Sequence, residues 1–538
     1  MNEIIRPHNL VRGRWLYTSV ILLTACIVIT LSGCNFFEQS ETIPITPSPS
    51  ISAQQQDHTS SQPTSEAEQF EELNAPAMLA HTWAELPDLK GAPRYTIDLS
   101  VNPDMRTFDG YARVEYTNSE DTPLDQVYFR LLPNGGGSYG DGSLNVSQVL
   151  VDGKSIKADL SLSDSVLNIP LQPALDASES VQIELEFSGQ VPANFGGTNG
   201  PAGYGIFNFS DGVLSLANWY PILAVYDEQG WNLDPVSSIG DSVYSDMAYY
   251  TVNLTAPGEL LVASTGVEIE RQASNGKTRY QFISGPARDF YIIMSQNFQV
   301  DSEIVDGTSV NIYRLHGDQE GSEEILSIAT NSLRVYNELF GHYPYSELDI
   351  VAAPLRYALG VEYPGIVLIR EDLTNEPADP TLAFVVAHEI AHQWWYNLVG
   401  NDVYDDPWLD EALASYSSSL AFEFSGNTST TRTLINYWEQ HYAKIVERGQ
   451  DDRVTQSLLY FEAPDNPRAY GGIVYSKGAL FFKALREKIG DEAFFRALQA
   501  YYQTYQYRIA RPDDLLNTFE ESSGRSLEEL YNEWLYSP

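Results

Sequence analysis

The strongest constraint on this chain is a His-Glu-x-x-His string, His388 to His392, followed after eighteen residues by Glu411. On a helix with 3.6 residues per turn, His388 and His392 lie on one face and can bind one ion together. Glu389 lies about 100° further round, where a carboxylate can reach a water molecule on the metal without binding the metal itself. With Glu411 as third ligand, the pattern predicts a catalytic zinc site and a metal-dependent hydrolase.

Helix signals surround both parts of this pattern. Asp379-Pro380 marks a helix start, the run from Leu382 to Tyr396 contains no Gly or Pro, and Gly400 marks a stop. A second helix is predicted to begin at Asp406-Pro407, with the Asp as cap and the Pro in the first turn, and to end near Gly426.

A chance occurrence of the string on an exposed helix is the alternative. The neighbouring Phe384, Val385, Ile390 and Trp394 are apolar and predict a buried helix instead. Buried His and Glu need partners to offset their desolvation. Together with the spaced Glu411, this favours the metal site.

These residues resemble the signature of the M1 gluzincin aminopeptidases, in which the third ligand lies in a Trp-Leu-x-Glu segment, here Trp408 to Glu411. That family has an upstream Gly-x-Met-Glu-Asn segment whose Glu binds the free amino group of the substrate. This chain has Leu359-Gly360-Val361-Glu362-Tyr363 at that place. The resemblance implies that Glu362 recognises the amine and that Gly360 belongs to the same substrate-binding segment. Three departures from the family segment predict altered backbone contacts with the substrate carbonyl; the alternative for Glu362 is a surface ion pair in a Gly/Pro-rich loop.

Downstream, Tyr475-Ser476-Lys477-Gly478-Ala479 is similar to the family's Tyr-x-Lys-Gly-Ala segment. In that family the tyrosine hydroxyl stabilises the oxyanion, and the resemblance implies this role for Tyr475. The chain has 34 tyrosines, so the residue type alone predicts only a core or surface position.

The resemblance implies one Zn²⁺ per chain, held by His388, His392 and Glu411, and Glu389 as general base. Glu362 would hold the ammonium group so that only the first peptide bond reaches the metal. The implied activity is removal of N-terminal residues from peptides with a free amino terminus. A zinc endopeptidase, or a non-catalytic surface binding protein on the same fold, remains an alternative.

The N-terminus predicts an extracytoplasmic location. Arg6, Arg12 and Arg14 precede an apolar run from Trp15 to Leu31, and Leu31-Ser32-Gly33-Cys34 resembles a bacterial lipobox. Residues 1–33 are therefore predicted to be a lipoprotein signal peptide, with lipid on Cys34 anchoring the protein to a bacterial membrane. An uncleaved membrane anchor is the alternative, because about seventeen apolar residues is the lower limit for crossing a bilayer.

Residues 34–80 are rich in Ser, Thr, Pro and Gln and predict a flexible tether, with a short helix near Glu66 to Glu72. The only cysteines are Cys26 and Cys34, so no disulfide is predicted in the folded part. Without residues 1–33 the chain has 28 Lys and Arg against 72 Asp and Glu, a net charge of −44. Such a charge repels phosphate backbones and excludes nucleic acid as an expected partner.

The remaining pattern predicts a multidomain β then α+β fold. Residues 81–300 alternate with period two, as in Ala112, Val114 and Tyr116 or Val181 to Phe187, and predict a β-sandwich or saddle domain. Asp109-Gly110 and Asp152-Gly153 are predicted hairpin turns. This domain is expected to form one wall of the cleft; an independent binding module is the alternative.

Residues 301–538 predict a thermolysin-like, mainly helical zinc peptidase domain, with a strand at Val310 to Leu315 and a helix near Glu323 to Phe340. Longer members of the family carry a large C-terminal helical domain for which this sequence has no room. The resemblance therefore implies a short form with a more open cleft that accepts longer peptides.

Overall fold

The computed structural model describes residues 73–538, apart from 85, 87–88, 90, 197–201, 316, 318, 464–465 and 467–468. The predicted signal peptide, Cys34, the helix near Glu66 to Glu72 and most of the predicted tether lie outside the described residues. Within the described residues, no helix has the length and apolar character needed to cross a membrane.

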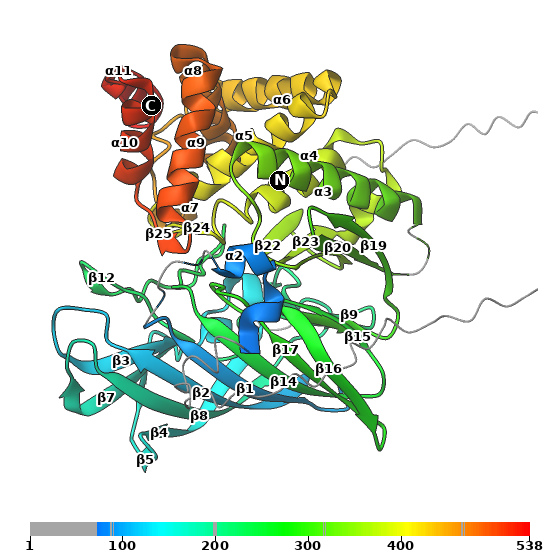
Figure 1. The fold of residues 1–538 in the computed structure, drawn as a ribbon, viewed down its shortest axis with the longest axis vertical. Helices are drawn as coiled ribbons and strands as arrows, with labels where there is room; N and C mark the ends of the chain where they lie inside the picture. The colour runs from blue at the N-terminus through cyan, green and yellow to red at the C-terminus, as the bar shows by residue number, and fades with distance from the viewer. Residues whose placement is uncertain are drawn as a thin grey trace, which may run out of the picture. The chain divides into compact units, whose positions relative to one another are not determined.

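An eight-stranded sheet forms the larger part of the N-terminal region (Figure 1). Its order is β16-β17-β14-β1-β2-β8-β4-β5, and only the β1/β14 pair is parallel among these pairings. The alternating residues predicted in β2 and β8 are buried, because one face of the sheet covers the core. The strands are β1 (Arg94–Val101), β2 (Thr107–Thr117), β4 (Ser143–Val151), β5 (Lys154–Ser155), β8 (Ser180–Gln190), β14 (Tyr249–Pro257), β16 (Val267–Ser274) and β17 (Lys277–Ile283).

Two four-stranded sheets and one short ribbon complete this region. Their orders are β15-β18-β10-β9, β11-β3-β7-β6 and β12-β13. Trp219 and Tyr220, which are fully buried, lie in the shared apolar core between these sheets. The strands are β3 (Leu124–Arg130), β6 (Asp159–Ser161), β7 (Val166–Leu175), β9 (Phe207–Ser210), β10 (Val213–Leu216), β11 (Ile222–Leu223), β12 (Tyr226–Asp227), β13 (Gly230–Trp231), β15 (Leu261–Ser264) and β18 (Ile292–Ser295), with short helices η2 (Leu132–Gly135) and η3 (Gly137–Tyr139).

One of the two predicted hairpin turns is wrong. Asp152-Gly153 joins β4 to β5, and both residues have positive φ, as a tight hairpin requires. Gly110 instead lies inside β2, where it pairs with Leu99 and Phe187. A Cβ atom at Gly110 would lie 2.2 Å from the Phe187 ring, so glycine here makes room for an aromatic neighbour rather than for a turn.

A five-stranded sheet and a group of helices form the C-terminal region, which confirms the predicted fold class. The sheet order is β19-β20-β21-β23-β22, and Figure 1 shows α3 and α4 lying along this sheet. The elements are β19 (Gln299–Val305), β20 (Thr308–Arg314), α3 (Gln319–Leu339), β21 (Glu347–Ala353), β22 (Gly360–Tyr363), β23 (Ile366–Arg370), η4 (Glu371–Asn375), α4 (Pro380–Ala391), β24 (Val399–Gly400), α5 (Trp408–Phe424), α6 (Thr428–Glu447), α7 (Leu458–Glu462), η5 (Gly471–Lys477), α8 (Gly478–Ile489), α9 (Asp491–Tyr505), β25 (Arg508–Ile509), α10 (Pro512–Ser523) and α11 (Glu528–Trp534).

The last residues assigned to the predicted tether are ordered against the C-terminal region. They form η1 (Ala75–Ala77) and lead into α2 (Ala80–Ala84). The Leu79 amide donates to the Pro344 carbonyl (2.8 Å) and the Ser346 amide donates to the Ala77 carbonyl (3.0 Å). Met78 is buried in the same core as α3. Residues 73–80 therefore belong to the folded domain and not to the predicted tether, because the buried Met78 and the backbone hydrogen bonds hold this segment on the domain.

A buried arginine connects three parts of the chain. The Arg288 guanidinium donates to the carbonyls of Tyr396 (2.7 Å), Asn397 (3.0 Å), Ser245 (2.8 Å) and Arg508 (2.7 Å). Its donors thus bind the segment before β14, the turn after α4 and strand β25. Burial lowers the pKa of Arg288, but a guanidinium stays charged in proteins. The Arg288 side chain therefore links the loop that follows the His-Glu-x-x-His helix to the β region.

Replacing Arg288 by Met is expected to lower the free energy of unfolding by about 3 kcal/mol, because four buried carbonyl groups would lose their donor. Arg288→Lys should recover only part of this loss, since an ammonium cannot reproduce the planar fork. Denaturant titration of both variants would measure the change in the free energy of unfolding. Arg432→Met, on the exposed face of α6, is the control and should change stability by less than about 0.5 kcal/mol; equal stability of Arg288→Met and wild type would contradict the account.

Candidate metal centre

Two neighbouring helices carry the predicted ligands. Helix α4 starts where predicted, with the Asp379 carboxylate accepting from the Thr381 amide (2.7 Å). It ends at Ala391, earlier than the apolar run suggested: the next residues form turns, and Tyr396 has a φ of 125°, which is incompatible with a helix. Helix α5 starts at Trp408. The predicted capping bond from the Asp406 side chain is absent at this helix start, since Pro407 is the capping residue and makes no side-chain bond.

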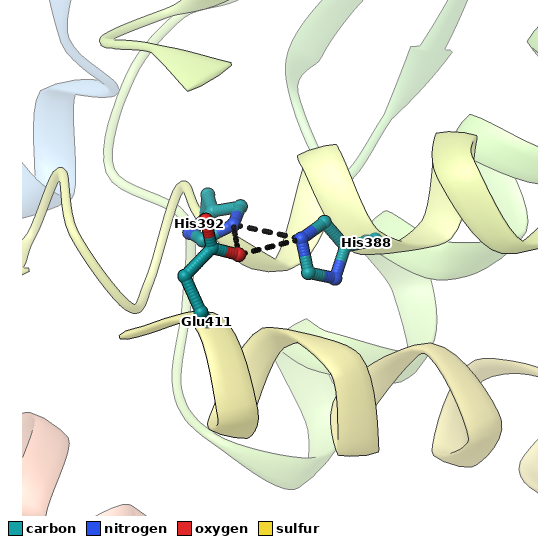
Figure 2. Close-up of side chains that lie close together, drawn as sticks. All are labelled: His388, His392 and Glu411. Carbon is teal, nitrogen blue, oxygen red and sulfur yellow. Dashed lines mark hydrogen bonds and ion pairs between the residues drawn. The ribbon is translucent and has the colours of Figure 1, made fainter. Parts of the chain in front are cut away.

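The three predicted ligand atoms converge on one point (Figure 2). The Nε2 atoms of His388 and His392 are 3.0 Å apart, and Glu411 Oε2 lies 3.1 Å from the first and 3.4 Å from the second. A tetrahedral zinc ion about 2.0–2.1 Å from each donor places the donors about 3.3–3.4 Å apart. The side chains are buried, with 4%, 0% and 7% of their residue surface exposed. The geometry and the chemistry of the donor set fit zinc.

Neighbouring groups orient these ligands. His392 Nδ1 donates a hydrogen bond to the Trp395 carbonyl (2.9 Å), and His388 Nδ1 lies 3.4 Å from Ser415 Oγ. The Nδ1 contacts leave both Nε2 atoms to face the centre, which is the usual arrangement of metal-binding histidines. Burial alone would raise the pKa of Glu411, but hydrogen bonds with the two histidines outweigh burial and lower this pKa to about 2. Glu411 is therefore an anionic ligand.

Glu389 lies beside the ligands without joining them. Its side chain is buried, and Oε2 has no hydrogen-bond partner among the described residues. Burial, partly offset by the charge of His392, raises the pKa of Glu389 to about 8. A carboxylate with a raised pKa and a free oxygen at a metal centre is suited to accept a proton from water.

Glu362 lies on the edge strand β22, not in a loop, and pairs with Val367 of β23. One ligand atom from each of Glu362, Glu389 and His392 lies within 4.8 Å of the others. The residue is 8% exposed, and no Lys or Arg of the described part forms an ion pair with it. Burial raises its pKa well above the ordinary value. The surface ion pair is thereby excluded as an explanation, and Glu362 is a buried acid facing the centre.

Gly360 allows β22 to approach the centre closely. A Cβ atom at this position would lie 2.2 Å from Oε1 and 2.5 Å from Cδ of Glu389. The edge strand therefore passes directly over the Glu389 side chain, and a side chain in place of Gly360 would displace the Glu389 carboxylate.

Tyr475 lies in η5, a turn of π-helix, and its ring stacks on His388 with centroids 5.6 Å apart. Its hydroxyl donates to Glu411 Oε1. Close packing of Gly472 on Ile445 of α6 and of Gly478 on Ala412 of α5 positions the turn. The structure thus brings all of the predicted site residues except Cys34, which lies outside the described residues, to one centre.

A cleft of about 450 Å³ opens onto this centre. Tyr204, Ile206 and Asp241 line it from the β region, which confirms that this region contributes a wall. Burial raises the pKa of Asp241 to about 6. The opposite wall includes residues of α6 that carry no motif, so spacing could not have identified them. Only their amphipathic helix pattern was visible in the sequence.

Residues 325–534, which contain every residue of the centre, match the family model described as Peptidase family M1 domain. The chain is 29% identical to Aminopeptidase M1-B of Oryza sativa subsp. japonica over 53% of this chain and 34% of that protein. It is 24% identical to Puromycin-sensitive aminopeptidase of Caenorhabditis elegans over 84% of this chain and 47% of that protein. The chain thus spans half or less of these relatives. An M1 zinc metallopeptidase from Deinococcus radiodurans has a similar fold, with a TM-score of 0.60 and 20% identity over 83% of this chain and 94% of that one.

Gly360→Ala is expected to displace the Glu389 carboxylate and to reduce kcat/KM for any hydrolysis at this centre by about 100-fold, because a misplacement near 1 Å can cost that much. Zinc binding should persist, since the ligands are untouched. Gly471→Ala is the matched control in the same cleft, where the nearest atom to a new Cβ is 3.7 Å away. Full activity of Gly360→Ala would show that the close approach of β22 has no catalytic role.

Proposed function

We propose that this chain is a zinc-dependent aminopeptidase that removes N-terminal residues from peptides. The observation that carries the proposal is the grouping of a three-ligand centre, the free carboxylate of Glu389 and the buried carboxylate of Glu362 around His392. In such a grouping a Lewis acid activates the peptide carbonyl, a base takes the proton of the attacking water, and an anchor for the amine places the first peptide bond between them. The matched M1 domain and the similar aminopeptidases support the same activity.

His388, His392 and Glu411 would hold the zinc ion, which when bound polarises a carbonyl group and lowers the pKa of water. Glu389 accepts the proton of the attacking water and returns it to the departing amine. Its unpartnered Oε2 is the atom available for this transfer. The approach of a cation to the centre favours the charged form of the carboxylate, so the proton-accepting state forms at neutral pH.

Glu362 pairs with the ammonium group of the substrate. A buried carboxylate without a cationic partner is costly, and an incoming ammonium group offsets that cost. Asp241 and Glu411 add negative potential around Glu362. This binding energy fixes the substrate so that its first peptide bond lies at Glu389, and a blocked terminus cannot use it.

Tyr475 donates a hydrogen bond to the oxygen that becomes negative during the attack. A hydroxyl carries one proton, so this role requires the Tyr475 hydroxyl to exchange Glu411 Oε1 for the substrate oxygen. The stacking of its ring on His388 holds the hydroxyl at the centre during this exchange.

Matched peptides with a free or an acetylated amino terminus test the proposal. The wild-type protein should cleave only the free form, and Glu389→Gln should lose activity by about 10³-fold or more while keeping zinc. Glu362→Gln should weaken cleavage of the free form mainly through KM. Equal cleavage of both forms would replace the aminopeptidase by an endopeptidase. No cleavage of any peptide would favour a binding role.

We further propose that the protein is a lipoprotein outside the cytoplasm of a bacterium, anchored to the membrane through Cys34. Support comes from the basic, apolar and lipobox-like segments of residues 1–34. A diacylated cysteine adds enough buried CH₂ groups for stable anchoring.

Cys34→Ser is expected to abolish incorporation of labelled fatty acid and to prevent removal of residues 1–33. Cys26→Ser, within the same apolar run, is the control and should be labelled normally. Labelling and the mass of the mature chain would be measured together. An unlabelled wild-type protein that retains residues 1–33 in the membrane fraction would favour the uncleaved anchor.

A further inference from the structure

The two ends of the cleft adjoin different metal ligands. Glu362 lies beside His392. Phe384 lies at the other ligand, with its ring centroid 5.2 Å from that of His388. If Glu362 holds the amine, a bound peptide runs from the His392 side toward the His388 side. The residue that follows the cleaved bond then lies near Phe384.

Aromatic side chains of α4 and α6 form a wall on the His388 side. Trp438 is buried and packs edge to face on Phe384, with centroids 6.4 Å apart. Tyr437 is 56% exposed, and its ring lies 5.5 Å from that of His441. All four residues line the cleft. The buried Trp438 supports the wall, and the exposed Tyr437 ring is free to contact a ligand.

A second exposed aromatic ring lines the same cleft. Tyr357, just before β22, lines the cleft and is 62% exposed. Its φ of 73° is unfavourable for any residue with a side chain and costs about 1 kcal/mol. The hydrogen bond from the Arg356 amide to the Tyr204 carbonyl (2.7 Å) and the packing of the Tyr204 and Tyr357 rings hold this conformation. The backbone is thus held where it exposes a tyrosine to the cleft.

The two ends of the cleft also differ in the charged residues that line them. Among the described residues that line the cleft, the acidic ones are Asp241, Glu362, Glu389 and Glu411. Three of these belong to the centre and its amine anchor, and Asp241 interacts electrostatically with Glu362 and Glu411. The aromatic walls include no carboxylate. In a chain with a net charge of −42, the lining of this end of the cleft carries no carboxylate, and the Arg356 guanidinium lies 5.3 Å from the Tyr357 ring centroid.

We propose that the cleft binds a large apolar or aromatic side chain on the second residue of the substrate, between Tyr437 and Tyr357, and that Tyr437 determines this preference. The proposal rests on the proposed aminopeptidase function, because that function fixes the direction of the peptide. Aromatic rings favour contact with another ring or with aliphatic groups over a hydrated or anionic side chain.

Tripeptides of the form Ala-X-Ala with a free amino terminus test the proposal, with Phe, Leu or Ala at X. For the wild-type protein, kcat/KM for X = Phe should exceed that for X = Ala by about tenfold or more. Tyr437→Ala should reduce the Phe/Ala ratio about two- to tenfold, and Tyr437→Phe should preserve it. The ratio cancels losses of folded or zinc-loaded protein. Tyr536→Ala, another exposed tyrosine, is outside the cleft lining and should leave the ratio unchanged.

The outcomes distinguish a failure of the proposed binding site from a failure of the proposed aminopeptidase function. Equal kcat/KM for X = Phe and X = Ala, or a ratio that Tyr437→Ala does not change, would overturn the binding site while leaving the aminopeptidase intact. Cleavage of none of the free tripeptides would overturn the proposed function, and the binding site with it.

Discussion

The arrangement of this protein depends on three buried ligand atoms that meet within 3.0–3.4 Å. Burying a carboxylate and two imidazoles is costly unless hydrogen bonds or a cation offset their desolvation. The surrounding structure meets this requirement locally. Contacts with the Trp395 carbonyl and the Ser415 hydroxyl orient the two histidine rings. The Tyr475 hydroxyl donates a hydrogen bond to the second carboxylate oxygen of Glu411. The packing of α4 against α5 therefore determines the geometry of the metal centre.

The two ends of the cleft around this centre differ in the residues that line them. The edge strand β22 brings Glu362 beside His392 and passes over Glu389 at Gly360. Glu362 and Glu389 lie beside His392, whereas aromatic rings of α4 and α6 line the cleft beside His388. Arg288 fastens the turn after α4 to the β region, so the walls of the cleft are held by the same packing that holds the ligands. The same packing therefore positions the residues that line the cleft and the residues that form the metal centre.

Local patterns in the sequence predicted the ligands and the fold class, because helix periodicity and strand alternation act over a few residues. The Asp152-Gly153 turn was predictable for the same reason. The turn at Asp109-Gly110 was wrong because a cross-strand ring, not the local sequence, requires that glycine. The partners of Arg288, the parallel β1/β14 pair and the aromatic wall of α6 join segments far apart in the chain. No single-sequence pattern encodes such contacts, and the tether boundary was missed because the packing of Met78 is likewise nonlocal.

Metal analysis of the purified protein, after dialysis against zinc and removal of loosely bound ions, tests the central claim most directly. The wild-type chain should retain one zinc ion, and His392→Ala should lose it, because the remaining donors leave an incomplete site. Glu389→Gln should retain the ion, since Glu389 is not a ligand. A wild-type chain that binds no zinc, or a His392→Ala variant that binds it as well as wild type, would contradict the account.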